Sequence, residues 1–596
     1  MPDLGGIHPS LIYFAGALLV ALAPAKPRKW VALGVAVLGF GAALGLSESA
    51  GPYTARLLNF DLVLMRVDAW SAIFANIFCL LSVIGVLYIL HENSRLQFSA
   101  GLLYAGAAVG VALSGDLITL FVFWEILTLG AVMCLITRRT VASGRAACRY
   151  FVIHALGGVI LMAGIVLHVA ETGSTAFSDI GLSGLGSYLI FIGIGVNCAW
   201  PVLGAWLTDT YPEASIGGVV FMATYTTKTA VYVLARTFPG EETLVWVGMA
   251  MATIPIFYAV IENDLRRVLA YSLINQVGFM VVGVGLGTGL SLNGTAAHAY
   301  CHILYKALLF MSIGAVMFRT GKSKATELGG LYRSMPLTCI FCCIGAASIS
   351  AFPLFSGFVS KSMIMSAAAK EGFVVVWMAL LFASAGVFHH AGIKIPFFAF
   401  FSHDSGIRCK EAPRNMLIAM GIAAFLCIFV GSFPNAFLYG MLPDQSPKAA
   451  YEPYTVGHVT DQLSLLLFSA LAFTLLMRAG LYPAEIRSVN LDFDWLYRKG
   501  GRAFYGVTDR VLNGTNRLVH AVFVRGFIPS LSRFFTEAPA RLLCWMMVPV
   551  WVGSGLTPEQ IASKREVMYV RAQRGVFPVG VTVCLAVLLL AFLFLF

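Results

Sequence analysis

The chain has 596 residues, of which 59% are hydrophobic and only 12% are charged, and its mean hydropathy is +0.83. This composition excludes a soluble globular protein. The formal net charge of +11 does not indicate a nucleic-acid-binding protein, because the basic residues are spread over many short segments between apolar runs. We therefore expect a polytopic membrane protein with no nucleic-acid partner.

About sixteen apolar runs follow one another, each long enough to cross a hydrocarbon core of about 30 Å as a helix. Basic loops follow the odd-numbered runs, so the positive-inside rule predicts that both termini lie outside the cytoplasm. We expect the first run to be retained as a span, since Asp3 and no basic residue precedes it. The runs lie near residues 8–25, 29–48, 69–91, 98–114, 116–137, 147–170, 186–207, 216–236, 241–262, 267–290, 294–318, 335–361, 372–402, 415–441, 461–482 and 575–596.

The cysteines do not indicate a metal or redox site. Twelve are scattered through the chain, and the stretch "CIFCC" (Cys339 to Cys343) lies within an apolar run without a second cysteine pair or clustered histidines. We interpret them as small core residues. No cofactor and no metal site is predicted for this chain.

Several ionisable residues lie inside the runs, where a charge costs about 3 kcal/mol. Glu125 is in the middle of its run, in "LFVFWEILTLG". In "HAYCHILYKALLF" three basic residues recur every four positions, which places them on one helical face. Lys361 and Lys394 could alternatively reach the interface as ordinary residues near a span end. The basic residues that we place inside runs are Lys228, His298, His302, Lys306, Lys361 and Lys394.

Taken together, these groups predict a hydrated polar path that suits protons. Apolar surroundings lower the pKa of a lysine and a nearby carboxylate raises it again, so moving a charge between them could switch proton binding and release, and histidine titrates close to neutral pH. Our hypothesis is that Glu125 and the six basic residues carry protons within the membrane. We expect Asp68, Asp116 and Asp209, which lie near the ends of runs, to cap helices or to belong to loops.

Several motifs resemble the antiporter-like subunits shared by respiratory complex I and the Mrp-type multisubunit cation/proton antiporters. The similarity extends from about Leu57 to Phe401. The stretches "WLTDTYPEAS" and "GIKIPFFAFF" look closest to the D-type subunit of the Mrp antiporters. The motifs that carry the resemblance are "FVFWEILTL", "NDLRRVLAYSLINQVGFM", "HAYCHILYKALLFMSIGAVM", "KATELGGLYRSMPLT" and "GAASISAFPLFSGFVSKSMI".

The resemblance implies an all-α polytopic membrane protein with two inverted five-helix repeats, each with a broken helix. The separation of 31 residues from Asn197 to Lys228 is close to the 33 from Lys361 to Lys394, which predicts that these pairs are equivalent. The expected segments are N-terminal helices (1–97), a first repeat (98–236), a second repeat (241–402), accessory helices (403–482), an amphipathic lateral helical segment (483–572) and a final span (573–596).

One position departs from the family. Aligned on "AWL", Asn197 stands where the family has the lysine of its first broken helix, and an asparagine carries no proton. Lys228 could take over, water alone could conduct in this part, or the chain could have lost full pumping.

By resemblance, the chain conducts protons in the cell inner membrane, in complex with other membrane subunits, and exchange for Na⁺ is the first candidate for the coupled process. One alternative is a subunit of a complex I-like or membrane-bound hydrogenase pump, with no redox centre in this chain. Another is a subunit that anchors a partner, for example in inorganic carbon uptake, with its transport degraded.

Overall fold

The structure is a computed structural model that describes residues 8–48, 52–481, 486, 490–574 and 579–595. The chain divides into two compact units, Met1–Asp494 and Trp495–Phe596. The described residues contain 12 helices that are long and apolar enough to cross a membrane, and four shorter apolar helices. The predicted all-α polytopic membrane fold is therefore confirmed, while the exact number of crossings stays a prediction.

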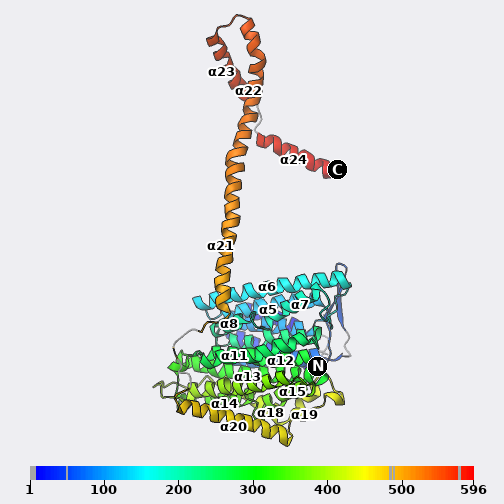
Figure 1. The fold of residues 1–596 in the computed structure, drawn as a ribbon, viewed down its shortest axis with the longest axis vertical. Helices are drawn as coiled ribbons and strands as arrows, with labels where there is room; N and C mark the ends of the chain where they lie inside the picture. The colour runs from blue at the N-terminus through cyan, green and yellow to red at the C-terminus, as the bar shows by residue number, and fades with distance from the viewer. Residues whose placement is uncertain (1–7, 49–51, 482–485, 487–489, 575–578, 596) are drawn as a thin grey trace. The chain divides into compact units, whose positions relative to one another are not determined.

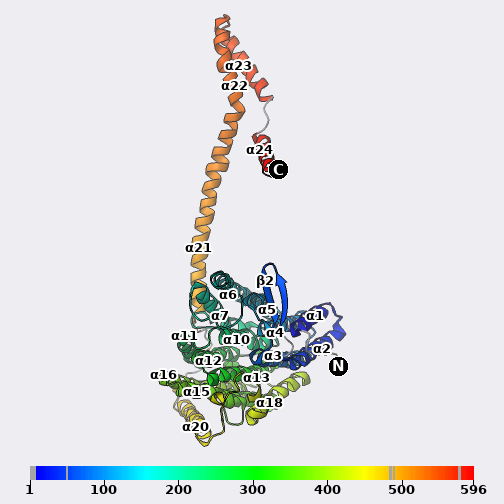
Figure 2. The same cartoon turned by 90° about the vertical axis from the view of Figure 1, so that its right-hand side faces the viewer.

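The helices of the first unit lie in layers, with α6 at one edge, α12 and α13 in the middle and α20 at the opposite edge (Figure 1). At the N-terminal side are the helices α1 (Pro9–Leu22), α2 (Ala25–Leu44) and α3 (Ala69–Tyr88). Between α2 and α3 is an antiparallel hairpin of β1 (Tyr53–Leu57) and β2 (Phe60–Met65), beside α5 (Figure 2). The sequence prediction missed this hairpin, because its strands are too short to register as an apolar run.

A first set of helices follows α3. Its third helix, α6, is long, and the helix after it is broken before α8. After this break, the segment that we predicted as one span over 216–236 holds two shorter helices. The elements are α4 (Arg95–Leu113), α5 (Leu117–Ile136), α6 (Val141–Thr172), α7 (Leu185–Asn197), α8 (Ala205–Thr210), η3 (Tyr211–Glu213), α9 (Gly218–Thr224) and α10 (Thr226–Thr237).

A second set repeats this succession, with a long third helix and a broken fourth one. Its last helix contains two π-helical segments, which are rare and frequently mark functional sites. The elements are α11 (Glu242–Ile261), α12 (Leu265–Leu286), α13 (Gly289–Thr320), η4 (Ala325–Glu327), η5 (Leu331–Arg333), α14 (Pro336–Ile349), α15 (Ser356–Lys370), α16 (Val374–Val387), η6 (Phe388–Ile393), α17 (Lys394–Pro396) and η7 (Phe397–Phe401).

The long helices of the two sets correspond closely. Both α6 and α13 have 32 residues and end at a left-handed glycine, Gly173 and Gly321. Three residues beyond each glycine, the chain forms an isolated β-bridge to the residue that caps the second helix of the set. The bridges are Asp116 to Ala176 and Asp264 to Lys324. The two sets therefore share a register in this region, whereas their inverted orientation stays a prediction.

The two breaks also correspond, and they correct the predicted equivalence of Asn197 with Lys361. Left-handed residues with side chains lie at Ala199 and Val202 in the first break, and at Ala351 and Leu354 in the second. Aligned on these residues, the sequence places Asn197 with Ile349, and Lys361 with Asp209. The sequence spacing suggested the wrong pair because the segments after the breaks differ in length.

The ends of these helices follow local sequence signals. Asp116 accepts hydrogen bonds from the backbone N–H groups of Ile118 and Thr119, so it caps α5. Thr140 and Ser143 form a capping box at the start of α6. Such caps satisfy N–H groups that have no partner within the helix.

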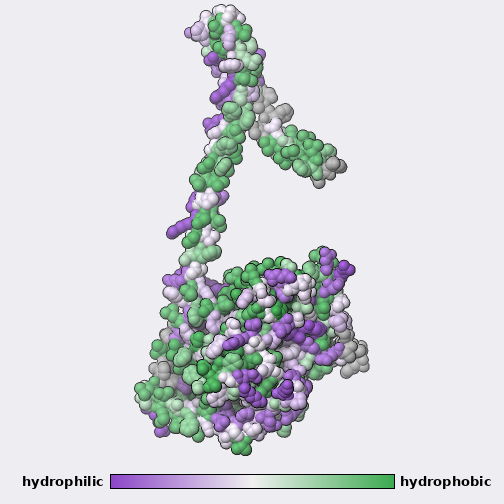
Figure 3. All heavy atoms as spheres, turned by 45° about the vertical axis from the view of Figure 1, so that its right-hand side comes forward, coloured by the Kyte–Doolittle hydropathy of each residue, from purple (hydrophilic) through white to green (hydrophobic). Residues whose placement is uncertain are grey.

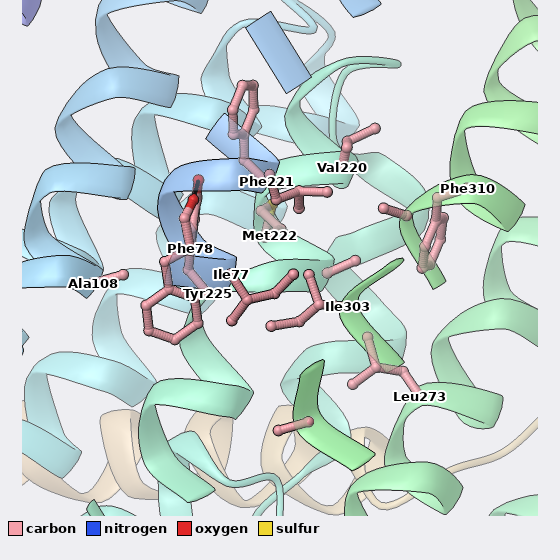
Figure 4. Packing of buried hydrophobic residues seen from close by; sticks show 14 of the residues in the cluster. Ile77, Phe78, Ala108, Val220, Phe221, Met222, Tyr225, Leu273, Ile303 and Phe310 are labelled. Atoms are coloured by element: carbon pink, nitrogen blue, oxygen red, sulfur yellow. Dashed lines mark hydrogen bonds between the residues drawn. The ribbon is translucent and has the colours of Figure 1, made fainter. Parts of the chain in front are cut away.

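The core of the first unit joins both sets. Buried apolar side chains from α3, α4, α9, α12 and α13 pack together in the region of Figure 4. The accessory region then adds α18 (Arg414–Ser432), α19 (Pro434–Phe437), η8 (Tyr439–Met441), η9 (Pro447–Ala449) and α20 (Val456–Arg478). Helix α18 packs against α13 and α3.

The second unit consists of helices alone among its described residues. A continuous helical stretch of 60 residues, Asp494–Gly553, comprises α21 (Asp494–Val519), the π-helical η10 (His520–Phe527) and α22 (Ile528–Gly553). Apolar side chains extend along much of it in the view of Figure 3, with hydrophilic groups between them. Helix α23 (Pro558–Arg574) packs against α22, and α24 (Val579–Leu595) covers the described part of the predicted final span.

Candidate functional site

Helix α13 carries the basic face that the sequence predicts. His298, His302 and Lys306 are all 0% exposed and lie at successive turns of this helix. Lys306 Nζ donates to Ser272 Oγ at 2.9 Å and to the carbonyl of Leu269 at 3.2 Å. Both partners belong to α12, so the ammonium group is held between the two central helices of the second set.

The two histidines of α13 differ in their contacts. His298 Nδ1 lies 3.0 Å from Ser360 Oγ on α15, and its Nε2 lies 3.5 Å from the hydroxyl of Tyr305. That hydroxyl donates to Gln276 Oε1 at 3.1 Å. His302, in contrast, has no hydrogen-bond partner for either ring nitrogen among the described residues. His302 therefore differs from His298, whose two ring nitrogens both lie near hydroxyl groups.

Lys361 lies next to the second helix break. Its Nζ donates to the carbonyl of Ile349, the last residue of α14, at 2.9 Å. The carbonyl is available because the left-handed residues Ala351 and Leu354 interrupt the helix. The ammonium also lies 5.3 Å from the centre of the Phe279 ring. The break thus creates the acceptor that holds a buried lysine.

Lys228 lies at the interruption between α9 and α10. Its Nζ donates to the carbonyl of Ala223 at 2.6 Å and to Thr227 Oγ1 at 3.2 Å. Lys228 is 0% exposed. Its ammonium group is close enough to interact electrostatically with His302 of α13. The first set thus contributes a cation to the buried basic residues of the second set.

Lys394 follows the first π-helical segment and holds the end of another helix. Its Nζ donates to the carbonyls of Val260 at 2.6 Å and Glu262 at 2.7 Å, and more weakly to Ala259. These carbonyls form the C-terminus of α11, where a cation is favoured by the helix dipole. His390 lies nearby with both ring nitrogens unpartnered among the described residues. Lys394 therefore has a structural role in addition to any role in transport.

The cationic residues of the cluster lack counter-charges. Among the described residues, Lys228, Lys306 and Lys361 form no ion pair with a carboxylate, and their partners are carbonyl and hydroxyl oxygens. Burying a charge without a partner is expensive unless the group releases its proton or water reaches it. Such an arrangement can bind and release protons.

Glu125 is not brought together with a lysine. Its side chain is partly buried on α5, and its Oε1 has no hydrogen-bond partner among the described residues. The carboxyl packs on Gly158 of α6, where an added Cβ would overlap Oε1. The glycine therefore provides the space in which the carboxyl lies.

Asn197 ends α7 at the first break and is 0% exposed. Neither its amide nitrogen nor its amide oxygen has a partner among the described residues. A buried amide without partners costs free energy unless water binds it. Asn197 is thus a buried polar side chain at the first break, and it carries no titrating proton.

Sequence reasoning missed the neutral partners of the basic residues. Ser272, Gln276, Ser360 and Tyr305 all contact the cluster, but polar residues within apolar runs are common and carry no signal of their own. The buried His154 on α6 was also missed, although it shares the register of His302. An alignment of the two long helices on their terminal glycines could have found it.

Asp68 and Asp116 have the expected capping roles, whereas Asp209 lies within α8 and not at a cap or in a loop. Asp68 caps α3 together with Ser71, and Asp116 caps α5. Asp209 forms a two-bond ion pair with Arg149, at 2.6 Å and 3.0 Å. In the part of the chain that the structure describes, no group of three or more histidine, cysteine, aspartate or glutamate side chains is arranged to hold a metal ion.

The chain is similar in sequence to known membrane transport proteins. Residues 114–388 match the family described as NADH:quinone oxidoreductase/Mrp antiporter, transmembrane. The chain is 26% identical to the A/B subunit of a probable K⁺/H⁺ antiporter of Rhizobium meliloti, over 71% of this chain and 46% of that protein. It is 28% identical to the D-type subunit of the Na⁺/H⁺ antiporter of Alkalihalophilus pseudofirmus, over 50% of this chain and 64% of that protein. The chain thus spans about half to two thirds of these relatives.

A solved structure has a similar fold. It is a membrane-bound sulfane sulfur reductase, an archaeal respiratory membrane complex. One of its chains matches with a TM-score of 0.69 at 21% identity, over 90% of this chain and 99% of that chain.

Proposed function

Because the chain belongs to the antiporter-like subunit family shared by Mrp-type cation/proton antiporters and respiratory complex I, we propose that it conducts protons as one subunit of a multisubunit membrane complex. The resemblance inferred from the sequence motifs is confirmed by the family match over residues 114–388. The activity, the coupled ion and the partner subunits of this chain are part of the proposal.

The observation that carries the proposal is the basic face of α13. His298, His302 and Lys306 are fully buried at successive turns, and Lys228 and Lys361 lie close enough to act on His302 by charge. Buried ionisable groups in a membrane protein are costly, and they are retained where they bind or move ions. A face with two imidazoles and an ammonium suits protons better than metal cations, since neither protonated group can ligate a cation.

Water completes the path in this proposal. The unpartnered ring nitrogens of His302 and His390 need hydrogen-bond partners that the described residues do not provide. Ordered water at these atoms would connect Lys306 with Lys394, whose charges both reach His390. Protons then pass laterally between the lysines through imidazole and water, and a change of charge at one site favours release at the next.

We propose monovalent cation exchange, with this chain in the place of the D-type subunit of an Mrp antiporter, as the process that proton conduction serves. The named activities of the two antiporter relatives support this choice. A redox-driven pump is the second candidate, favoured by the match of 90% of the chain to one chain of a respiratory membrane complex. In both cases the chain would lie in the cell inner membrane, since the matched relatives are bacterial antiporter subunits.

Substitution of Lys306 by alanine tests the proposal in the intact complex, reconstituted into liposomes with a pH-sensitive dye. We expect Lys306→Ala to lower proton flux about a hundredfold, since it removes a buried proton carrier. Lys370→Ala is the matched control, because Lys370 is exposed at the end of α15 and should not affect flux. Unchanged flux in Lys306→Ala would overturn the proposal. In the same vesicles, proton flux driven by a Na⁺ or K⁺ gradient would indicate cation exchange. Proton flux driven by an electron donor would indicate a redox-driven pump.

A further inference from the structure

His154 is a buried histidine of the first set that corresponds to a member of the basic cluster in the second. The helices α6 and α13 have equal length and end at the left-handed glycines Gly173 and Gly321. Counted back from these glycines, His154 occupies the position of His302. By the same count, Gly158 occupies the position of Lys306.

The hydrogen bond of His154 fixes its tautomer. Its Nδ1 lies 2.9 Å from the carbonyl oxygen of Tyr150, which can only accept, so Nδ1 carries the hydrogen. Nε2 is then a free acceptor, and it has no partner among the described residues although the side chain is 0% exposed. The ring stacks on Tyr150 at 3.8 Å and meets Trp206 edge-on at 4.4 Å. The imidazole is therefore held rigidly with one basic nitrogen available.

The same face of α6 contacts Glu125 on one side. Gly158 lies one turn beyond His154, and an added Cβ there would overlap Glu125 Oε1. The neighbouring Gly157 packs against Val196, the residue before Asn197. His154 thus lies on the part of α6 that contacts Glu125 through Gly158 and the end of α7 through Gly157.

Hydroxyl groups lie on the side of Tyr150 that leads towards Lys228. Tyr150, which stacks on His154, has its hydroxyl 2.9 Å from Thr226 Oγ1, and the hydroxyl of Tyr104 bonds to the same atom. The next residue, Thr227, accepts a hydrogen bond from Lys228 Nζ at 3.2 Å. Two neighbouring threonines of α10 therefore contact the Tyr150 hydroxyl and the Lys228 ammonium separately.

We propose that His154 is the proton-carrying group of the first set, at the position that His302 occupies in the second. The inference rests on the proposed function. Nε2 takes a proton from water on the Glu125 side, which forms an imidazolium, and the same N–H gives it up to water on the Lys228 side. Nδ1–H stays on the Tyr150 carbonyl throughout, and the step needs no oxidant or reductant.

The groups around His154 fit a relay of this kind. Its surroundings contain carboxyls, phenols, a thiol and an ammonium on several different elements. The titratable groups that face this region are Tyr104 on α4, Glu125 on α5, Tyr150 on α6, Cys198 after α7, Asp209 on α8 in its ion pair with Arg149, and Lys228 on α10.

Two substitutions separate proton transfer from packing. His154→Phe keeps an aromatic ring for Tyr150 and Trp206 but removes both nitrogens, and His154→Gln keeps polarity without a titrating group. In the reconstituted complex we expect both variants to lower proton flux about tenfold. His168→Gln is the matched control on α6, since that histidine is partly exposed near the end of the helix. Imidazole added to His154→Gly should restore part of the flux.

The outcomes distinguish this inference from the proposed function. If His154→Phe conducts like the unmodified complex while Lys306→Ala does not, His154 is a packing residue and the inference is overturned, but the proposed function stands. If neither variant affects flux, both proposals are wrong. The amount of intact complex in the vesicles is measured for each variant, and the proton flux is divided by this amount.

Discussion

The two sets of helices share a backbone plan but carry different chemistry on it. The long helices α6 and α13 end at equivalent glycines, and both broken helices use two left-handed residues. At two of three equivalent positions, however, the second set has a basic residue where the first has a small or an acidic residue. The pairs are His154 and His302, Gly158 and Lys306, and Asp209 and Lys361.

The same backbone arrangement therefore carries different charged side chains in the two sets. In the second set, the break leaves a free carbonyl at Ile349 that holds Lys361. In the first set, the equivalent residue is Asp209, which forms an ion pair with Arg149. The Glu125 carboxyl packs against Gly158.

Lys361 and Asp209 occupy equivalent positions after the two breaks, and substituting them should give the largest difference in proton flux between the two sets. We expect Lys361→Ala to lower proton flux at least about tenfold, because it removes a buried carrier. Asp209→Asn should leave flux unchanged and lower the unfolding free energy by no more than about 1 kcal/mol, since it breaks only a partly exposed ion pair. Flux in reconstituted vesicles and thermal unfolding in detergent measure the two effects. An equal loss of flux in both variants would mean that the two breaks work alike.

A methyl group at Gly158 should have a smaller effect. The Cβ of Gly158→Ala would overlap Glu125 Oε1, so the carboxyl must turn away. The carboxyl is the end of a flexible side chain, so we expect the unfolding free energy to change by less than about 1 kcal/mol. Flux should fall about fivefold, because a displaced proton-transfer group works less efficiently.

Gly144→Ala provides the control for that substitution. Gly144 lies on the same helix, and an added Cβ would meet nothing within 4 Å. If both variants conduct equally well, the position of the Glu125 carboxyl does not matter for transport, and the first set works without it.

The helices and the basic face of α13 could be predicted from the sequence because both depend on local periodicity. Apolar runs of sufficient length specify spans, and a spacing of four residues places His298, His302 and Lys306 on one face whatever surrounds the helix. Pro353 and Gly357 lie at the second helix break, and both residue types disfavour a continuous helix locally.

Tertiary relations could not be predicted in this way. The carbonyls that hold Lys394 lie more than a hundred residues earlier in the chain, on α11. The correspondence of Lys361 with Asp209 became visible only through the left-handed residues of the two breaks. The importance of Gly158 depends on a carboxyl from another helix, and a glycine in an apolar run gives no sign of this.

The ends of the two sets differ as well, and this difference should have the smallest effect. Arg236, near the end of α10, forms an ion pair with Asp68, whereas Lys394 in the second set bonds to backbone carbonyls. Burial alone would raise the pKa of the Asp68 carboxyl, but Arg236 and the Ser71 amide outweigh it and hold the pKa below its usual value of 3.8. A lowered pKa in the folded state means that this stabilisation is present above about pH 4 and is lost as the pH falls through the lowered pKa.

Asp68→Asn isolates this contribution, because asparagine still caps α3 but carries no charge. At pH 6 we expect the variant to be less stable than the unmodified chain by about 0.5 kcal/mol, the size typical of a partly exposed ion pair. At pH 3 the difference should become smaller, since the carboxyl begins to take up a proton there. Thermal unfolding at the two pH values measures it. A difference that is the same at both would show that the Asp68 charge does not stabilise the end of the first set.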